Sequence, residues 1–286
     1  MPKPEHQNHE HRIIRDEICT AASPQLAWEA WADPEKIAGW FVDRAAGKAE
    51  TGGEITWYFD SFNLALPYKV LEAVPGERFS ILWEGPMPPP GILEVIIERD
   101  AGETLIRLVQ SGFREGAEWN EEYEGVASGW RLALASLREY LEHYFGERRT
   151  TLLLTRPAQF SYTEVSRYYR DPALLGQWLT NQPSGRAASA GSIGDAGEKC
   201  ELDLRGGGKL TGRVLARTER EVALSWAEER GVLELKAFSM GPQKTLCLRA
   251  SLWNAAPERA KQIEEQLTAA IDRLAGILQK SANAGA

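Results

Sequence analysis

The sequence predicts an α+β protein made of two tandem copies of one domain, each a curved antiparallel sheet wrapped around a long C-terminal helix. Two observations support this prediction. A series of short motifs recurs in the same order in both halves of the chain, which indicates an internal duplication. In each half, a run of strand-like segments precedes one long amphipathic pattern, which is typical of a sheet with helices on one side.

The duplication is visible in six pairs of motifs that follow one another in the same order, and five of the pairs are offset by 138 to 143 residues. The matched pairs are Asp33-Pro34 and Asp171-Pro172, Trp40 and Trp178, 52–53 and 206–208, 78–83 and 221–226, 92–94 and 232–234, and 104–108 and 245–249. One such match could arise by chance, but an ordered series predicts domains over residues 12–147 and 150–280. Flexible tails are expected at 1–11 and 281–286.

The first copy should begin with a helix over residues 24–32, because Ser23 can cap it and Pro24 suits its first turn. A second helical turn is expected over 34–40. Strands are predicted from β-branched and aromatic residues, with a hairpin at Asp100-Ala101-Gly102. The predicted strands are 55–59, 68–74, 78–83, 92–98 and 104–110.

Each copy ends in a pattern that repeats at steps of three and four residues, which places the apolar side chains on one helix face. The two series are Trp130, Leu134, Leu137 and Leu141 in the first copy, and Ile263, Leu267, Ala270, Leu274 and Ile277 in the second. A curved sheet that grips such a helix leaves an interior space, so we expect an apolar cavity.

Composition limits the classes of function. The net charge is −8, and acidic residues outnumber basic ones in the first half. This argues against nucleic acid as a partner, because phosphate binding needs clustered cations. The sequence shows neither a signal peptide nor an apolar run long enough for a membrane span. The sparse cysteines Cys19, Cys200 and Cys247 favour reduced thiols and a cytoplasmic location.

Three segments carry a family likeness: Pro24–Phe41, Ser111–Phe113 and Glu118–Glu142. They resemble bacterial homologues of the C-terminal domain of the heat-shock-protein-90 ATPase activator, in the START-related (SRPBCC) superfamily. The resemblance covers residues 12–145, and the second copy lacks the last two segments. It implies a helix-grip fold with a deep apolar cavity, in a superfamily whose members bind lipids, hormones and polyketides and include a few enzymes.

We predict that aromatic side chains line the cavity of the first domain. The candidate ligand-binding residues are Trp40, Phe41, Trp57, Trp83, Phe113, Trp119, Tyr123, Trp130 and Leu134. The same residue types would also build an ordinary filled core, so both interpretations stay open. Trp119 lies in a polar loop and is predicted to cover the mouth of the cavity.

Polar candidates are weaker. The acidic residues Glu115, Glu118, Glu121, Glu122 and Glu124 precede a predicted helix, so a solvated loop is favoured over an acid–base pair or a cation site. His6, His9 and His11 lie in the tail, and His143 is expected at the surface. Charged residues in strands, such as Lys69, Arg107 and Arg249, are expected to face solvent, although an inward arginine could bind a carboxylate. No catalytic residue, metal site or cofactor is predicted.

Three functions follow from these patterns. The first is non-catalytic binding of a small hydrophobic or aromatic molecule, mainly in the first domain. The second is a chaperone-associated or stress-response interaction module. The third is an enzyme acting on a hydrophobic, polyketide-like substrate, for which Glu122 and Tyr123 are the first residues to consider. The expected partner is therefore a small apolar molecule, with a chaperone as the protein alternative.

Overall fold

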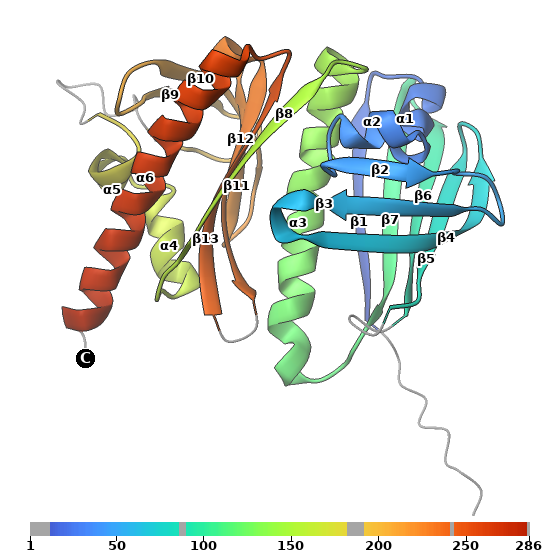
Figure 1. The fold of residues 1–286 in the computed structure, drawn as a ribbon, viewed down its shortest axis with the longest axis horizontal. Coiled ribbons are helices and arrows are strands. Elements are labelled where there is room, and N and C mark those ends of the chain that lie inside the picture. The colour runs from blue at the N-terminus through green and yellow to red at the C-terminus, as the bar shows by residue number, and fades with distance from the viewer. Residues whose placement is uncertain (1–11, 86–89, 182–191, 241–242, 285–286) are drawn as a thin grey trace, which may run out of the picture. The chain divides into compact units, whose positions relative to one another are not determined.

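The computed structural model describes residues 12–85, 90–181, 192–240 and 243–284. These residues form two antiparallel sheets, each followed in the chain by a long helix, α3 or α6 (Figure 1). The predicted α+β class with two tandem helix-grip domains is confirmed. By its contacts the chain divides into two compact units, one of residues up to Ile37 with Arg44–Ala127, the other of Ala38–Asp43 with Ser128 onwards. The domain limits 12–147 and 150–280 come from the repeat and stay a prediction.

Among the described residues, the first sheet has seven strands in the order β1-β7-β6-β5-β4-β3-β2. Their bounds are β1 Arg12–Thr20, β2 Arg44–Gly47, β3 Glu54–Phe59, β4 Leu64–Val74, β5 Arg78–Trp83, β6 Gly91–Asp100 and β7 Glu103–Phe113. All five strands predicted for the first copy are present. Side chains on one face of this sheet are mostly buried, and we call it the inner face.

The helices of the first copy also follow their local signals. Helix α1 spans Pro24–Ala32, and the Ser23 hydroxyl accepts a hydrogen bond from the Leu26 amide at 3.3 Å, as an N-cap should. Helix α2 spans Pro34–Ala38 and is therefore shorter than the predicted turn over 34–40. Helix α3 spans Asn120–Glu139 and continues into a π-helical turn at Tyr140–Tyr144.

The second sheet has six described strands in the order β8-β13-β12-β11-β10-β9. Their bounds are β8 Arg149–Pro157, β9 Lys199–Asp203, β10 Lys209–Arg217, β11 Glu221–Trp226, β12 Gly231–Met240 and β13 Gln243–Trp253. The helices of this half are α4 Tyr162–Tyr168, α5 Pro172–Trp178 and α6 Pro257–Ala284. Helix α6 thus includes residues 281–284 of the expected C-terminal tail, whereas the tail 1–11 with its three histidines lies outside the described residues.

The first strand of each copy, β1 or β8, was not predicted from the sequence. Strand β1 pairs with β7 at the edge of the first sheet, and β8 pairs with β13 at the edge of the second. In β1 the exposed Arg15 and Glu17 alternate with the inward Ile14 and Asp16. Edge strands carry such charges on their solvent face, so the segment resembles a polar tail until its pairing partner is known.

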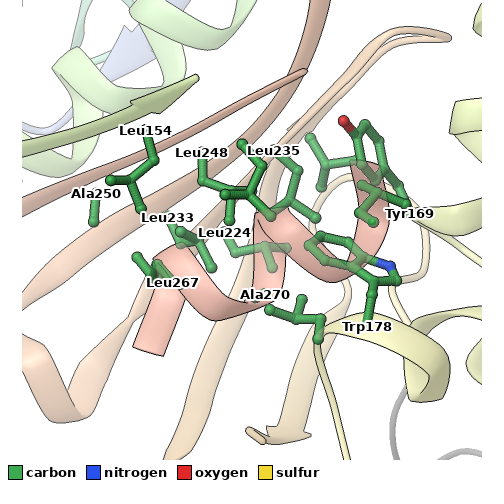
Figure 2. Close-up of a cluster of buried hydrophobic side chains, with 14 of the residues drawn as sticks. Leu154, Tyr169, Trp178, Leu224, Leu233, Leu235, Leu248, Ala250, Leu267 and Ala270 are labelled. Carbon is green, nitrogen blue, oxygen red and sulfur yellow. The ribbon is translucent and has the colours of Figure 1, made fainter. Parts of the chain in front are cut away.

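Helix α6 packs on a closely filled core in the second unit. Leu267 and Ala270 from the helix face Leu233 and Leu235 of the sheet, and Trp178 joins them from α5 (Figure 2). The indole of Trp178 is fully buried, and its Nε1 donates to the Tyr168 carbonyl at 3.0 Å. Side chains therefore occupy the grip of the second copy, where a ligand would otherwise bind.

The outer face of the first sheet is a solvated surface of ion pairs, as predicted for charged residues in its strands. Lys69 pairs with Glu84 at 2.6 Å, and Arg107 pairs with Glu17 at 3.1 Å. All four side chains are more than two-fifths exposed, so these pairs contribute little to stability. Arg249 of the second sheet is an exception, because its side chain is only 15% exposed.

A β-bulge in β7 explains the Ser111–Phe113 motif. The register between β1 and β7 shifts there, so that Arg12 pairs with Phe113 while Ile14 pairs with Gln110. Gly112 has a φ of +95°, and a Cβ added to it would lie 2.7 Å from the Gly91 Cα. Only glycine satisfies both the left-handed backbone and this close approach.

Gly112→Ala should therefore destabilise the protein more than Gly102→Ala. Gly102 has the same φ of +95°, but no atom lies within 4 Å of the position that a Cβ would take, so it isolates the backbone effect. We expect about 1 kcal/mol for Gly102→Ala and roughly 1–3 kcal/mol more for Gly112→Ala from overpacking. Urea denaturation measures both values. Equal losses would show that the approach to Gly91 imposes no constraint.

Candidate functional site

Three aromatic side chains from neighbouring strands line the inner face of the first sheet. Trp57 comes from β3, Tyr68 from β4 and Trp83 from β5, and Tyr68 pairs directly with Trp83 in the strand register. The Tyr68 ring lies between the two indoles, with centroid distances of 4.8 Å to Trp57 and 5.7 Å to Trp83. We call these three residues the aromatic triad.

The triad is buried at one end and accessible at the other. Trp57 is 1% exposed, whereas Tyr68 and Trp83 are only half-buried. The repeat equivalent of Trp83 in the second copy is Trp226, which is 1% exposed and donates its indole N–H to the Lys209 carbonyl at 2.9 Å. The same position is thus closed in the second copy and partly open in the first.

Tyr68 brings a polar atom to this apolar surface. Among the hydrogen bonds between described residues, none involves its hydroxyl. Burial raises the pKa of the Tyr68 phenol well above its ordinary value of 10, so the group remains a protonated donor at neutral pH. Tyr68 was not among the residues predicted from the sequence. The signal available was its position in the strand preceding the RFSILW segment, but the pairing with Trp83 depends on the strand register.

A second aromatic group follows the β-bulge. The Phe113 and Tyr123 rings meet edge to face at 5.5 Å, and the Tyr123 hydroxyl donates to the Ile13 carbonyl at 3.1 Å. Trp119 lies between these two residues in the sequence and is half-buried. The Arg114 guanidinium lies 4.4 Å from the centroid of its ring. Because its hydroxyl already has a partner, Tyr123 is not poised as a catalytic acid. The covering role of Trp119 stays a prediction.

The remaining predicted residues belong to the second unit. Phe41 stacks on Trp130 at 5.1 Å and contacts Trp40 at the same distance. Trp40, Trp130 and Leu134 are buried, with Leu134 fully so. Of the nine predicted ligand-binding residues, Trp57 and Trp83 belong to the aromatic triad together with Tyr68. The other ring contacts join Phe113 to Tyr123, and Phe41 to Trp40 and Trp130.

An open hollow of about 450 Å³ lies elsewhere on the first unit, between β2, β3 and their connection. It is lined by Ala46, Gly47, Lys48, Glu50, Gly53, Glu54 and Thr56. None of the predicted aromatic residues contributes to it. It is therefore separate from the aromatic cavity that the sequence predicts.

The other polar candidates do not form a site. All five predicted glutamates are exposed, but only Glu115 and Glu118 precede α3, whereas the other three lie in its first turns. His143 is also exposed, with Nε2 4.0 Å from Glu139. Within the described ranges, no three His, Cys, Asp or Glu side chains converge as metal ligands would. Burial raises the pKa of the Cys200 and Cys247 thiols to about 12, which keeps them protonated and unreactive at neutral pH.

A charged cluster is buried on the outer face of the second sheet. Glu234 is 3% exposed, and its carboxylate lies 3.4 Å from Lys236 Nζ and 3.8 Å from Arg249. Ser136 of α3 donates to the same carboxylate at 3.1 Å. Burial alone would raise the pKa of Glu234, but the two cations and the Ser136 hydroxyl outweigh it and lower that pKa below 4.5.

Glu221 forms the second half of this cluster. It accepts a hydrogen bond from Ser128 of α3 at 2.5 Å and lies 3.7 Å from Lys236. The two carboxylates raise the pKa of Lys236 even though burial opposes this. Since every buried charge has a partner of opposite sign, the cluster is a structural contact between α3 and strands β11 and β12 rather than an open acid–base site.

The same cluster continues to the segment Ala38–Asp43. Arg249 donates to the Phe41 carbonyl at 2.7 Å, and Arg149 donates to the Trp40 and Val42 carbonyls, each at 2.5 Å. The Trp253 indole N–H donates to the carbonyl of the residue before Trp40 at 2.9 Å. Four consecutive carbonyls are thus bound by side chains of β8 and β13. The expectation that Arg249 faces solvent is wrong, because this segment covers it.

The first half of the chain matches a known family. Residues 21–142 match the family described as activator of Hsp90 ATPase homolog 1-like protein. The curated proteins include no match to this chain. No described helix has the length and apolar character to cross a membrane.

Several solved structures are similar. The solution structure of the Aha1 dimer from Colwellia psychrerythraea has 21% identity and a TM-score of 0.42, covering 46% of this chain and 97% of that one. Protein MLL2253 from Mesorhizobium loti has 23% identity and a TM-score of 0.41, with coverages of 46% and 96%. DynU16, from the dynemicin biosynthetic locus, has 17% identity and a TM-score of 0.41, with coverages of 93% and 98%.

The sheets and their long helices define a tandem helix-grip protein, in which the first copy retains a partly open aromatic surface and the second is filled. Within it, residues 21–142 match the activator of Hsp90 ATPase homolog 1-like family, which is less than half of the chain.

Glu234→Gln should lower the free energy of unfolding by about 3 kcal/mol at pH 7, because Lys236 and Arg249 would lose their shared counter-charge. Since the pKa of Glu234 is lowered by folding, its contribution is present above the ordinary value near 4.5 and is lost as pH falls through the folded value. The difference between wild type and variant should therefore shrink in acid. Urea denaturation between pH 3 and 7 measures it.

The matched control is Glu201→Gln, which removes an exposed carboxylate 3.3 Å from Lys209. It should cost less than about 1 kcal/mol at any pH. A loss at Glu234 no larger than this control would contradict a stabilising role for the buried cluster.

Proposed function

We propose that the first domain binds a small hydrophobic or aromatic molecule against the inner face of its sheet, without catalysis. The observation that carries the proposal is the contrast between the half-buried Trp83 and its fully buried repeat equivalent, Trp226. Both copies share the strand order around this position. The first copy nevertheless keeps accessible aromatic surface where the second has closed its core.

The energetics favour an apolar ligand. A half-buried indole beside a half-buried phenol leaves apolar area in contact with water. Covering on the order of 100 Å² of such area would contribute about 2.5 kcal/mol, apart from the ligand's own buried surface. Aromatic rings also prefer tilted or offset partners, and the triad already has tilted rings, with interplanar angles of 55° and 54°.

A protein-interaction role is the second candidate, and one observation favours it. Phe62, in the connection between β3 and β4, and Leu64, the first residue of β4, are 41% and 43% exposed. Exposed apolar side chains of this size can mark a protein contact. The family description adds Hsp90 as a candidate partner. The free thiols Cys19, Cys200 and Cys247 support a cytoplasmic location for either function.

Native mass spectrometry of the protein purified from its own host should detect a stoichiometric apolar small molecule. Denaturing the complex would release the molecule for identification. An empty protein whose melting temperature does not respond to a broad panel of apolar compounds would contradict ligand binding.

Trp83→Ala should weaken binding of the fluorescent probe N-phenyl-1-naphthylamine about tenfold, because it removes accessible aromatic area worth roughly 1–2 kcal/mol. Tyr58→Ala is the matched control. Tyr58 is next to Trp57 on β3 but faces outward under the Arg44 guanidinium, 3.6 Å from its ring centroid. Equal loss in both variants would place the probe elsewhere.

The second candidate predicts that the protein raises the ATPase rate of Hsp90 and that Phe62→Ser removes most of this stimulation. Probe binding should be unaffected by that variant, because Phe62 is exposed and outside the aromatic triad. A protein that leaves the ATPase rate unchanged would remove this candidate.

A further inference from the structure

We infer that the molecule bound at the aromatic triad is planar and aromatic and carries a neutral hydrogen-bond acceptor, such as a ketone or quinone oxygen, to which the Tyr68 hydroxyl donates. This inference rests on the proposed function and assigns the polar contact within the same site. It makes Tyr68 a specificity-determining residue.

Tyr68 lies at the centre of the triad. Its ring is flanked by Trp57 and Trp83 at 4.8 and 5.7 Å, and both are tilted against it by more than 50°. The partly accessible end of this surface consists of Tyr68 and Trp83. A molecule that covers Trp83 would therefore also meet Tyr68, and flat rings provide the largest contact with such a surface.

The Tyr68 hydroxyl differs from those of four other tyrosines in the chain. Tyr123 donates to the Ile13 carbonyl and Tyr169 to the Lys236 carbonyl, Tyr162 bonds to the Ser239 hydroxyl, and Tyr140 accepts from the Gly146 amide, at distances of 3.0 to 3.1 Å. The described residues provide no such partner for Tyr68. Because no described residue accepts a hydrogen bond from it, this hydroxyl is available to an acceptor on a ligand that covers the triad.

The surroundings of Tyr68 favour a neutral ligand. Burial raises the pKa of its phenol, so it offers a proton rather than a negative charge. Its register partners on the two sides, Ile55 and Trp83, are uncharged. The neighbouring Lys69 belongs to the outer face and pairs with Glu84 at 2.6 Å. A carboxylate or phosphate would lose water at this surface without gaining a counter-charge, so a neutral acceptor fits better.

The test uses two flat probes of nearly equal shape, 2-acetylnaphthalene and 2-isopropenylnaphthalene, which differ in having a carbonyl oxygen or a CH₂ group. Competition with N-phenyl-1-naphthylamine measures both affinities. In the wild type we expect the ketone to bind about five- to tenfold more tightly. Tyr68→Phe keeps the ring and removes only the hydroxyl, so it should reduce this ratio to about one.

Tyr58→Phe is the control for general effects of removing a hydroxyl, because it lies on the other face of the same sheet. It should preserve the preference for the ketone. Thermal melting establishes that both variants fold. The inference is overturned if the wild type binds both probes equally, or if Tyr68→Phe retains the preference, and in either case the proposed apolar site still stands. If neither compound displaces N-phenyl-1-naphthylamine, the inference is also overturned, and if N-phenyl-1-naphthylamine itself does not bind, the proposed function fails as well.

Discussion

Burial of the Glu234 carboxylate constrains the whole second unit. A carboxylate removed from water needs compensating charge, and Lys236, Arg249 and the Ser136 hydroxyl supply it. Arg249 also donates to the Phe41 carbonyl. The Glu234 carboxylate therefore connects Ser136 of helix α3, directly, and the segment Ala38–Asp43, through Arg249, to the second sheet. The second sheet is consequently covered on both faces, by α6 on one and by these elements on the other.

The two copies differ in how completely the aromatic side chains inside the fold are buried. In the second copy, Trp178 and Trp226 are fully buried and their indole N–H groups bond to backbone carbonyls, so the space inside the grip is used for packing. Dense packing of this kind contributes to stability. In the first copy, the side chains of Tyr68 and Trp83 remain partly accessible.

Local signals made much of the fold predictable. The Ser23 cap and Pro24 mark α1, and Ala101 and Gly102, with φ of +47° and +95°, form the hairpin expected at that point. Strand β1 lacked such a signal, because charged residues on an edge strand look like a solvated tail. Strand β8 was not predicted either, although it contains three consecutive leucines. For the candidate site, the sequence identified Trp57 and Trp83 as aromatic lining but offered no reason to group them.

By itself the sequence determined the duplication, the run of strands before a terminal helix in each copy, and the family likeness of its first half, because these depend on local patterns and ordered motifs. Only the tertiary structure placed Tyr68 between two indoles and buried Glu234 and Arg249. Alternation of apolar and polar residues along a strand shows which side chains share a face. It does not show which strand lies beside it or what covers that face. Those depend on pairing and packing between segments far apart in the chain.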